Sequence, residues 1–116
     1  MTTAFAGLHL VLVEPSAAQA RHIAGQLEDL GIRLAGTYAT GREALAAMAA
    51  APPDVVLSAL YLPDMAGTEL VTAMRADTTL EATAFVLVSS ETRPQALEPV
   101  RQSGACAILP KPFDQR

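Results

Sequence analysis

The feature that most constrains the fold is a regular alternation of short apolar runs with longer stretches of helical periodicity. Runs rich in Val, Leu and Ile lie at residues 8–13, 32–38, 54–60, 85–89 and 105–109. Short, nearly continuous runs of this kind are typical of strands that helices cover on both faces. The second run is the weakest, because Ala35 and Gly36 dilute it.

Between these runs, local signals mark where helices begin and end. Ser16 and Thr40 are each followed three residues later by Gln or Glu, the spacing of a capping box. Gly31 and then Pro52–Pro53 are expected to end the two helices that start there. Two further helices are predicted, one that carries Leu70, Val71 and Met74 and one from Thr92 to Gly104. Strands that alternate with helices predict a parallel sheet with helices on both faces, in a single α/β domain.

Composition and charge exclude several classes of protein. The 116 residues are 51% hydrophobic and 17% charged, which fits one compact domain. No apolar run approaches the roughly 18 residues that cross a bilayer, and the first residues do not resemble a secretory signal, so we expect a cytoplasmic domain without membrane contact. The net charge of −4 and the scattered basic residues argue against direct binding of nucleic acid. Cys106 is the only cysteine and is expected to be a buried structural thiol.

Functional residues of such a sheet gather at the carboxyl ends of the strands. The loops there follow Val13, Ala59, Ser89 and Leu109. Three stretches stand out: Leu-Val-Leu-Val-Glu at 10–14, a segment at 54–67 that ends in Leu-Pro-Asp-Met-Ala-Gly, and Lys-Pro-Phe at 111–113. With these motifs at these spacings, the chain resembles the receiver domain of bacterial response regulators over its whole length. The resemblance implies a flavodoxin-like, doubly wound sheet of five parallel strands in the order 2-1-3-4-5.

Receiver domains take a phosphoryl group from a phosphohistidine onto an aspartate that ends the third strand, beside a magnesium ion held by carboxylates. The resemblance implies that this site lies at Glu14, Pro15, Ala59, Ser89 and Lys111. Glu14, Ser89 and Lys111 fit the family pattern. Pro15 stands at the second acidic position, and Ala59 stands where the acceptor aspartate belongs. We therefore expect a degenerate, pseudo-receiver site with no catalytic residue, no resident metal, and magnesium binding that is lost or very weak.

Two further positions bear on this site. The family commonly has an aromatic switch residue three positions before the lysine, and Ile108 stands there instead, as an expected core residue. Lys111 can either grip a bound anion or pair with Glu14, and the pairing is the expected outcome once the acceptor is absent.

Ser58, Asp54 and Asp64 each carry a side-chain oxygen near Ala59 in the sequence and are the candidates for a substitute acceptor. Ser58 is adjacent, but side chains alternate along a strand, so it is expected on the opposite side of the sheet. Asp54 lies about 16 Å away along the strand, at roughly 3.3 Å per residue. Asp64 in the following loop is the best remaining candidate, but the expected role of Asp64 is that of a loop or helix-start residue, since receiver domains often have an acidic residue there that is not phosphorylated.

The altered site leaves two hypotheses for the function of the chain, and a third that is less favoured. The first is a two-component or phosphorelay module that is not an enzyme and binds a protein partner, a second domain of the same protein, or a second copy of itself without being phosphorylated. The second is a receiver that is still controlled through phosphorylation of a residue such as Asp64. The third is an enzyme or small-molecule sensor that uses the emptied pocket.

The resemblance also implies a fifth helix, which would begin where the sequence stops at Arg116. We therefore expect a single domain, residues 1–116, that is truncated before its last helix. An apolar sheet face near Phe85 or Val86 and Cys106 or Ile108 is expected to be uncovered, and to be covered by another chain or by further residues.

Overall fold

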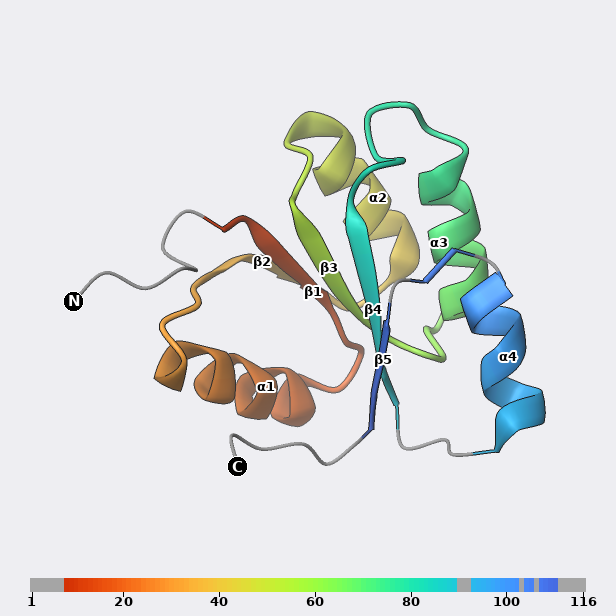
Figure 1. Cartoon of the computed structure of the whole chain (residues 1–116). Coiled ribbons are helices and arrows are strands. Elements are labelled where there is room, and N and C mark those ends of the chain that lie inside the picture. The colour runs from red at the N-terminus through yellow and green to blue at the C-terminus, as the bar shows by residue number, and fades with distance from the viewer. Residues whose placement is uncertain (1–7, 90–92, 103, 106, 111–116) are drawn as a thin grey trace.

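The computed structural model describes residues 8–89, 93–102, 104–105 and 107–110. Strands and helices alternate along the chain (Figure 1) in the order β1 (Leu10–Val13), α1 (Ala17–Asp29), β2 (Leu34–Tyr38), α2 (Gly41–Ala50), β3 (Val55–Ala59), α3 (Gly67–Arg75), β4 (Ala84–Ser89), α4 (Pro94–Gln102) and β5 (Ala107–Pro110). No helix within these residues is long and apolar enough to cross a membrane.

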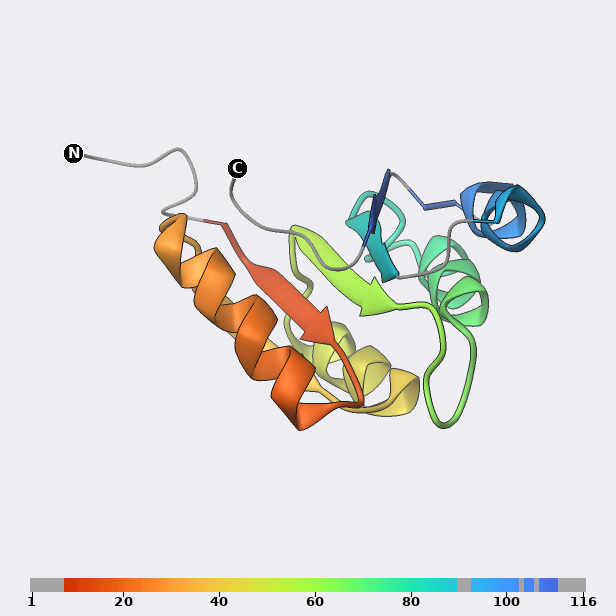
Figure 2. The same ribbon diagram turned by 90° about the horizontal axis from the view of Figure 1, so that it is seen from below.

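The strands form one sheet in the order β2-β1-β3-β4-β5, and every neighbouring pair is parallel. The predicted flavodoxin-like, doubly wound fold and its strand order are confirmed. All carboxyl ends therefore lie at the same edge of the sheet, which Figure 1 shows at the bottom and Figure 2 shows from below.

Side chains that alternate along the strands build one core on each face of the sheet. In β1, Leu10 and Leu12 pack with α1, whereas Val11 and Val13 pack with α2 and α3. The α1 core consists of Leu10, Leu12, Ala20, Ile23, Leu27, Ile32, Leu57 and Val88. The α2/α3 core is the larger one and includes Ala44, Met48, Val56, Leu70, Val71, Met74, Phe85 and Leu87.

The predicted helix starts are confirmed by their caps. The Ser16 hydroxyl accepts the N–H of Gln19 at 3.3 Å, and the Thr40 hydroxyl accepts the N–H of Glu43 at 3.1 Å. Gly31 ends α1 with a left-handed backbone, φ 84°, as glycine at this position commonly does. The next residue, Ile32, donates its N–H back to the Leu27 carbonyl at 2.8 Å. For that reason β2 begins at Leu34 and not at Ile32 as predicted.

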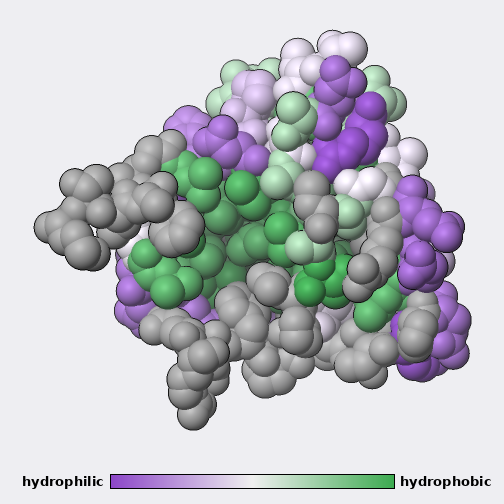
Figure 3. All heavy atoms as spheres, in the orientation of Figure 1, coloured by the Kyte–Doolittle hydropathy of each residue, from purple (hydrophilic) through white to green (hydrophobic). Residues whose placement is uncertain are grey.

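Apolar surface remains on the sheet face that carries α1, in the middle of the view in Figure 3. Val86 is only half-buried there, and its register partner on β5, Ala107, is exposed. Of the alternatives that the sequence offered for this face, Val86 agrees with the structure, whereas Phe85 and Ile108 do not. Phe85 is fully buried in the α2/α3 core and Ile108 packs against the same core, because both alternate to the other face. Cys106 and residues 111–116, at whose end the resemblance implies that a fifth helix would begin, lie outside the described residues.

Candidate functional site

The sheet register brings the candidate site residues to one edge. Val13 on β1 lies opposite Ser58 on β3. Glu14 and Ala59, the next residue of each chain segment, therefore lie at the same height in the sheet. Ala59 in turn lies opposite Val88, one residue before Ser89. Glu14, Ala59 and Ser89 therefore meet at the carboxyl ends of three adjacent strands, as the sequence predicted.

Glu14 is fixed by the turn between β1 and α1. Its side chain is buried, with 6% of its surface exposed, and its carboxylate accepts the Ser16 N–H at 3.1 Å. Its own N–H donates to the Tyr38 carbonyl at 2.9 Å, which ties the turn to the end of β2. Pro15 is exposed and supplies neither a side-chain ligand nor an N–H group.

Ala59 is the last residue of β3 and is buried, so a methyl group occupies the centre of the site. The neighbouring Ser58 is fully buried, and its hydroxyl donates to the Ala59 carbonyl at 2.9 Å. Its oxygen is thus enclosed by the core and not presented to a substrate. Ser89 ends β4 and is also buried, opposite Pro110 on β5.

Two of the predicted positions lie on or after β5. Ile108 is partly buried and packs against the α2/α3 core. Lys111 lies outside the described residues, so its pairing with Glu14 stays a prediction.

Asp64 lies in the β3–α3 loop but binds the start of a different helix, α2. Its Oδ1 accepts the Gly41 N–H and its Oδ2 accepts the Arg42 N–H, both at 2.9 Å. With the Thr40 hydroxyl on Glu43, the first three N–H groups of α2 all have acceptors. The Gly41 and Arg42 hydrogen bonds hold the pKa of the Asp64 carboxyl below its ordinary value of 3.8.

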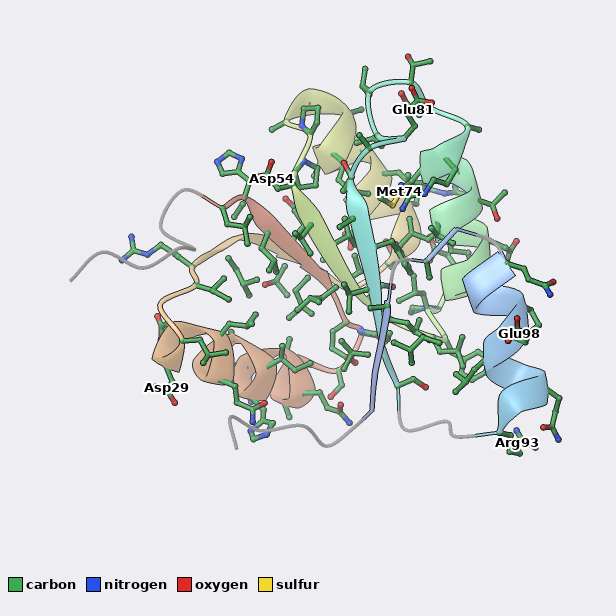
Figure 4. The ribbon with its side chains drawn as sticks, viewed as in Figure 1. Asp29, Asp54, Met74, Glu81, Arg93 and Glu98 are labelled. Atoms are coloured by element: carbon green, nitrogen blue, oxygen red, sulfur yellow. The ribbon has the colours of Figure 1, made fainter. Side chains whose placement is uncertain are left out.

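Asp54 lies just before the amino end of β3, the opposite end from Ala59 and the same end of the sheet as the loop that carries Glu81 (Figure 4). Its carboxylate accepts the His9 N–H at 2.9 Å, and its own N–H donates to the His9 carbonyl at 2.8 Å. Asp54 therefore joins the starts of β3 and β1 and takes no part in the candidate site.

The donor set at the carboxyl edge does not suit magnesium. Magnesium in proteins prefers octahedral oxygen ligands that include carboxylates. The described residues contribute one carboxylate there, Glu14, which already accepts a backbone N–H, and the Ser89 hydroxyl. No three His, Cys, Asp or Glu residues in the described part of the chain gather in a way that could hold a metal ion.

The recess beside Glu14 opens away from Ala59. It has a volume of about 370 Å³ and lies between α1 and the end of β2. Its lining consists of Glu14, Pro15, Ala17, Ala20, Arg21, Ala24, Thr37, Tyr38 and Ala39. Neither Ala59 nor Ser89 contributes to it, so this recess is not the emptied acceptor pocket that the sequence suggested for a sensor.

A family model described as the response regulator receiver domain matches residues 10–116. The chain belongs to this family. The chemotaxis response regulator CheY4 of Vibrio cholerae is similar to this receiver domain, with 32% identity and a TM-score of 0.85 over 92% of this chain and 88% of that chain.

Receiver domains of histidine kinases are similar as well. One from Syntrophus aciditrophicus has 25% identity and a TM-score of 0.82 over 93% of this chain and 81% of that chain. One from a sensor histidine kinase of Pseudomonas aeruginosa, solved with magnesium in its active-site cleft, has 25% identity and a TM-score of 0.84 over 94% of this chain and 88% of that chain. The chain is thus a receiver domain of the two-component class.

The sequence identified the residues of the carboxyl edge but missed what Asp64 does. The two residues of α2 whose N–H groups Asp64 accepts, Gly41 and Arg42, lie 23 and 22 residues earlier in the chain. The Thr40 cap of the same helix was visible, because its partner is only three residues away.

Proposed function

We propose that this receiver domain signals by binding a protein partner without being phosphorylated itself. The observation that supports the proposal is the place of Ala59, buried at the end of β3 between the positions of Glu14 and Ser89. Phosphoryl transfer to a receiver requires a nucleophilic oxygen at this point, and a methyl group has none. In this proposal the domain is not an enzyme, because it does not catalyse transfer of a phosphoryl group to itself.

The surroundings of Ala59 argue in the same direction. A magnesium ion neutralises the charge of a transferring phosphoryl group, and its ligands are mainly carboxylates and phosphate oxygens. Pro15 offers no ligand, and the Glu14 carboxylate is engaged with the Ser16 N–H. Magnesium binding is therefore expected to be absent or very weak.

Phosphorylation of Asp64 is the competing function, and the hydrogen bonds of this residue argue against it. Both carboxylate oxygens accept N–H groups from the first turn of α2. Phosphorylation would turn one of these oxygens into the bridging oxygen of an acyl phosphate, a much poorer acceptor, and so weaken its hydrogen bond to the helix N–H.

The partner in this proposal is a protein, a second domain of the same chain, or a second copy. The half-buried Val86 and exposed Ala107 give an apolar sheet face that such a chain can cover. The net charge of −4 argues against nucleic acid. We propose a cytoplasmic, two-component signalling role without membrane contact.

Rebuilding the acceptor site tests this proposal. We expect Ala59→Asp alone to be phosphorylated very little by acetyl phosphate and magnesium, because Pro15 still denies the metal a ligand. The double variant with Pro15→Asp is expected to gain a phosphoryl group, measured by intact mass. Equal phosphorylation of the single and double variants would show that the metal argument is wrong. Failure of a folded double variant to react would show that more than these two positions separates the site from an active one.

A further inference from the structure

The loop between β3 and α3 points one aromatic side chain into solvent while its neighbours point inward. Tyr61 is 68% exposed, whereas Leu60 and Leu62 on either side are buried in the α2/α3 core. Only one other large hydrophobic side chain in the described part of the chain is exposed, Leu30 at 44%. Tyr61 lies two residues after Ala59, the altered acceptor position at the end of β3.

The loop that carries Tyr61 is closed by backbone hydrogen bonds. Tyr61 and Ala66 form an antiparallel bridge. On either side of it, the Leu62 N–H donates to the Met65 carbonyl at 2.9 Å and the Gly67 N–H donates to the Leu60 carbonyl at 2.6 Å. The two chain segments of the loop therefore run side by side as a small hairpin.

The tip of this hairpin is anchored to α2. Asp64 accepts the N–H groups of Gly41 and Arg42, and Met65 lies so close to Gly41 that a Cβ added to Gly41 would collide with the Met65 side chain. A side chain presented from a loop held at both its base and its tip loses little conformational freedom on binding. Rigidly held aromatic residues of this kind are frequent anchors of protein interfaces.

The charge beside the ring indicates what the anchor fits. The Glu69 carboxylate accepts the Ala66 N–H at 2.9 Å, directly across the bridge from Tyr61, and Asp64 carries a second carboxylate on the same loop. Both residues are exposed. An exposed aromatic ring on a loop that also carries exposed carboxylates suits an Arg or Lys side chain, which can stack on the ring and pair with an acid.

We infer that the hairpin of residues 60–66 is a docking surface of this domain, separate from the apolar sheet face at Val86 and Ala107, with Tyr61 as its anchor for a protein segment that presents a basic side chain beside apolar ones. This inference rests on the proposed function and deepens it, because the docking surface adjoins the position at which an active receiver is phosphorylated.

A random peptide library displayed on phage tests the inference with a defined probe. We expect selection on the wild-type domain to enrich peptides that contain Arg or Lys next to apolar residues. The affinity of a synthetic peptide from the selection should fall by about tenfold or more for Tyr61→Ala, as for an interface anchor, and recover substantially for Tyr61→Phe. Leu30→Ala is the matched control, since it also removes an exposed large apolar side chain, and it should bind as the wild type does.

The other outcomes would overturn the inference. Peptides that bind Tyr61→Ala as tightly as the wild type would place the docking surface elsewhere, and so would a selection that enriches no peptide. Because Tyr61 is exposed, the circular dichroism of its variants should match that of the wild type. Failure of the proposed function is measured separately, since phosphorylation of the wild-type domain would contradict that proposal whatever Tyr61 does.

Discussion

Arg75 at the end of α3 joins three segments that are separate in the sequence. Its Nη1 donates to the carbonyl of Thr83 at 2.7 Å and to those of Leu80 and Glu81 at 3.3 and 3.2 Å. Its Nη2 and Nε donate to the Gly104 carbonyl at 2.9 and 3.2 Å. The guanidinium thus fastens the α3–β4 loop and the turn before β5 to the end of α3.

Replacing this side chain should cost a large part of the stability of the domain. A hydrogen bond to a charged group contributes about 1.5–3 kcal/mol, and the shortest bonds, to Thr83 and Gly104, should dominate. The weaker bonds share a donor and reach a loop that water can solvate. We therefore expect Arg75→Ala to lower the free energy of unfolding by about 3 kcal/mol, out of about 5–15 kcal/mol for a typical domain. Arg75→Lys keeps the charge but loses the planar fork, so its loss should be intermediate.

Urea unfolding followed by circular dichroism measures this loss. Arg21→Ala, which removes an exposed arginine from the middle of α1, is the matched control and should change stability by about 0.5 kcal/mol or less. Equal stability losses for Arg75→Ala and Arg21→Ala would refute the reasoning, because the hydrogen bonds of Arg75 would then contribute nothing beyond an ordinary surface side chain.

Two further changes probe particular backbone and charge features. Gly104→Ala should lower the urea midpoint, because Gly104 has φ 115° and an added Cβ would lie 2.9 Å from Arg75. In the matched change Gly25→Ala in α1, the added Cβ meets no atom within 4 Å, so this variant should be more stable than the wild type by about 0.5–1 kcal/mol. The reverse order of the two midpoints would contradict this. Asp64→Asn should lower the midpoint at neutral pH, since an amide cannot accept both helix N–H groups. Because the folded pKa of Asp64 is depressed, its contribution is present above 3.8 and is lost as the pH falls through the folded pKa, so the difference from wild type should shrink in acid; a difference that is constant with pH would be the contrary result.

The order of strands and helices could be predicted because each element carries its own signal. The apolar runs of β1, β3 and β4 are nearly continuous, and the caps at Ser16 and Thr40 act across three residues. Parallel strands have their carboxyl ends at one edge of the sheet, so the sequence also predicts that Glu14, Ala59 and Ser89 lie close together.

Features that depend on contacts across long sequence separations could not be predicted in this way. Nothing within the β3–α3 loop indicates that Asp64 binds the start of α2, and nothing near Arg75 indicates that it reaches Gly104, 29 residues later. Alternation on β4 places Phe85 and Val86 on opposite faces, but which face the helices cover depends on the packing of α3 against the sheet.

Intact-mass spectrometry of the wild-type domain after incubation with acetyl phosphate and magnesium tests the central claim most directly. The variant that carries both Pro15→Asp and Ala59→Asp serves as the positive control for the phosphodonor. The account predicts that the wild-type mass does not change, because Ala59 has no oxygen to attack phosphorus and both Asp64 oxygens are bound by α2. A gain of one phosphoryl group by the wild type, abolished by Asp64→Asn, would contradict it and show that the domain is a receiver still switched by phosphate.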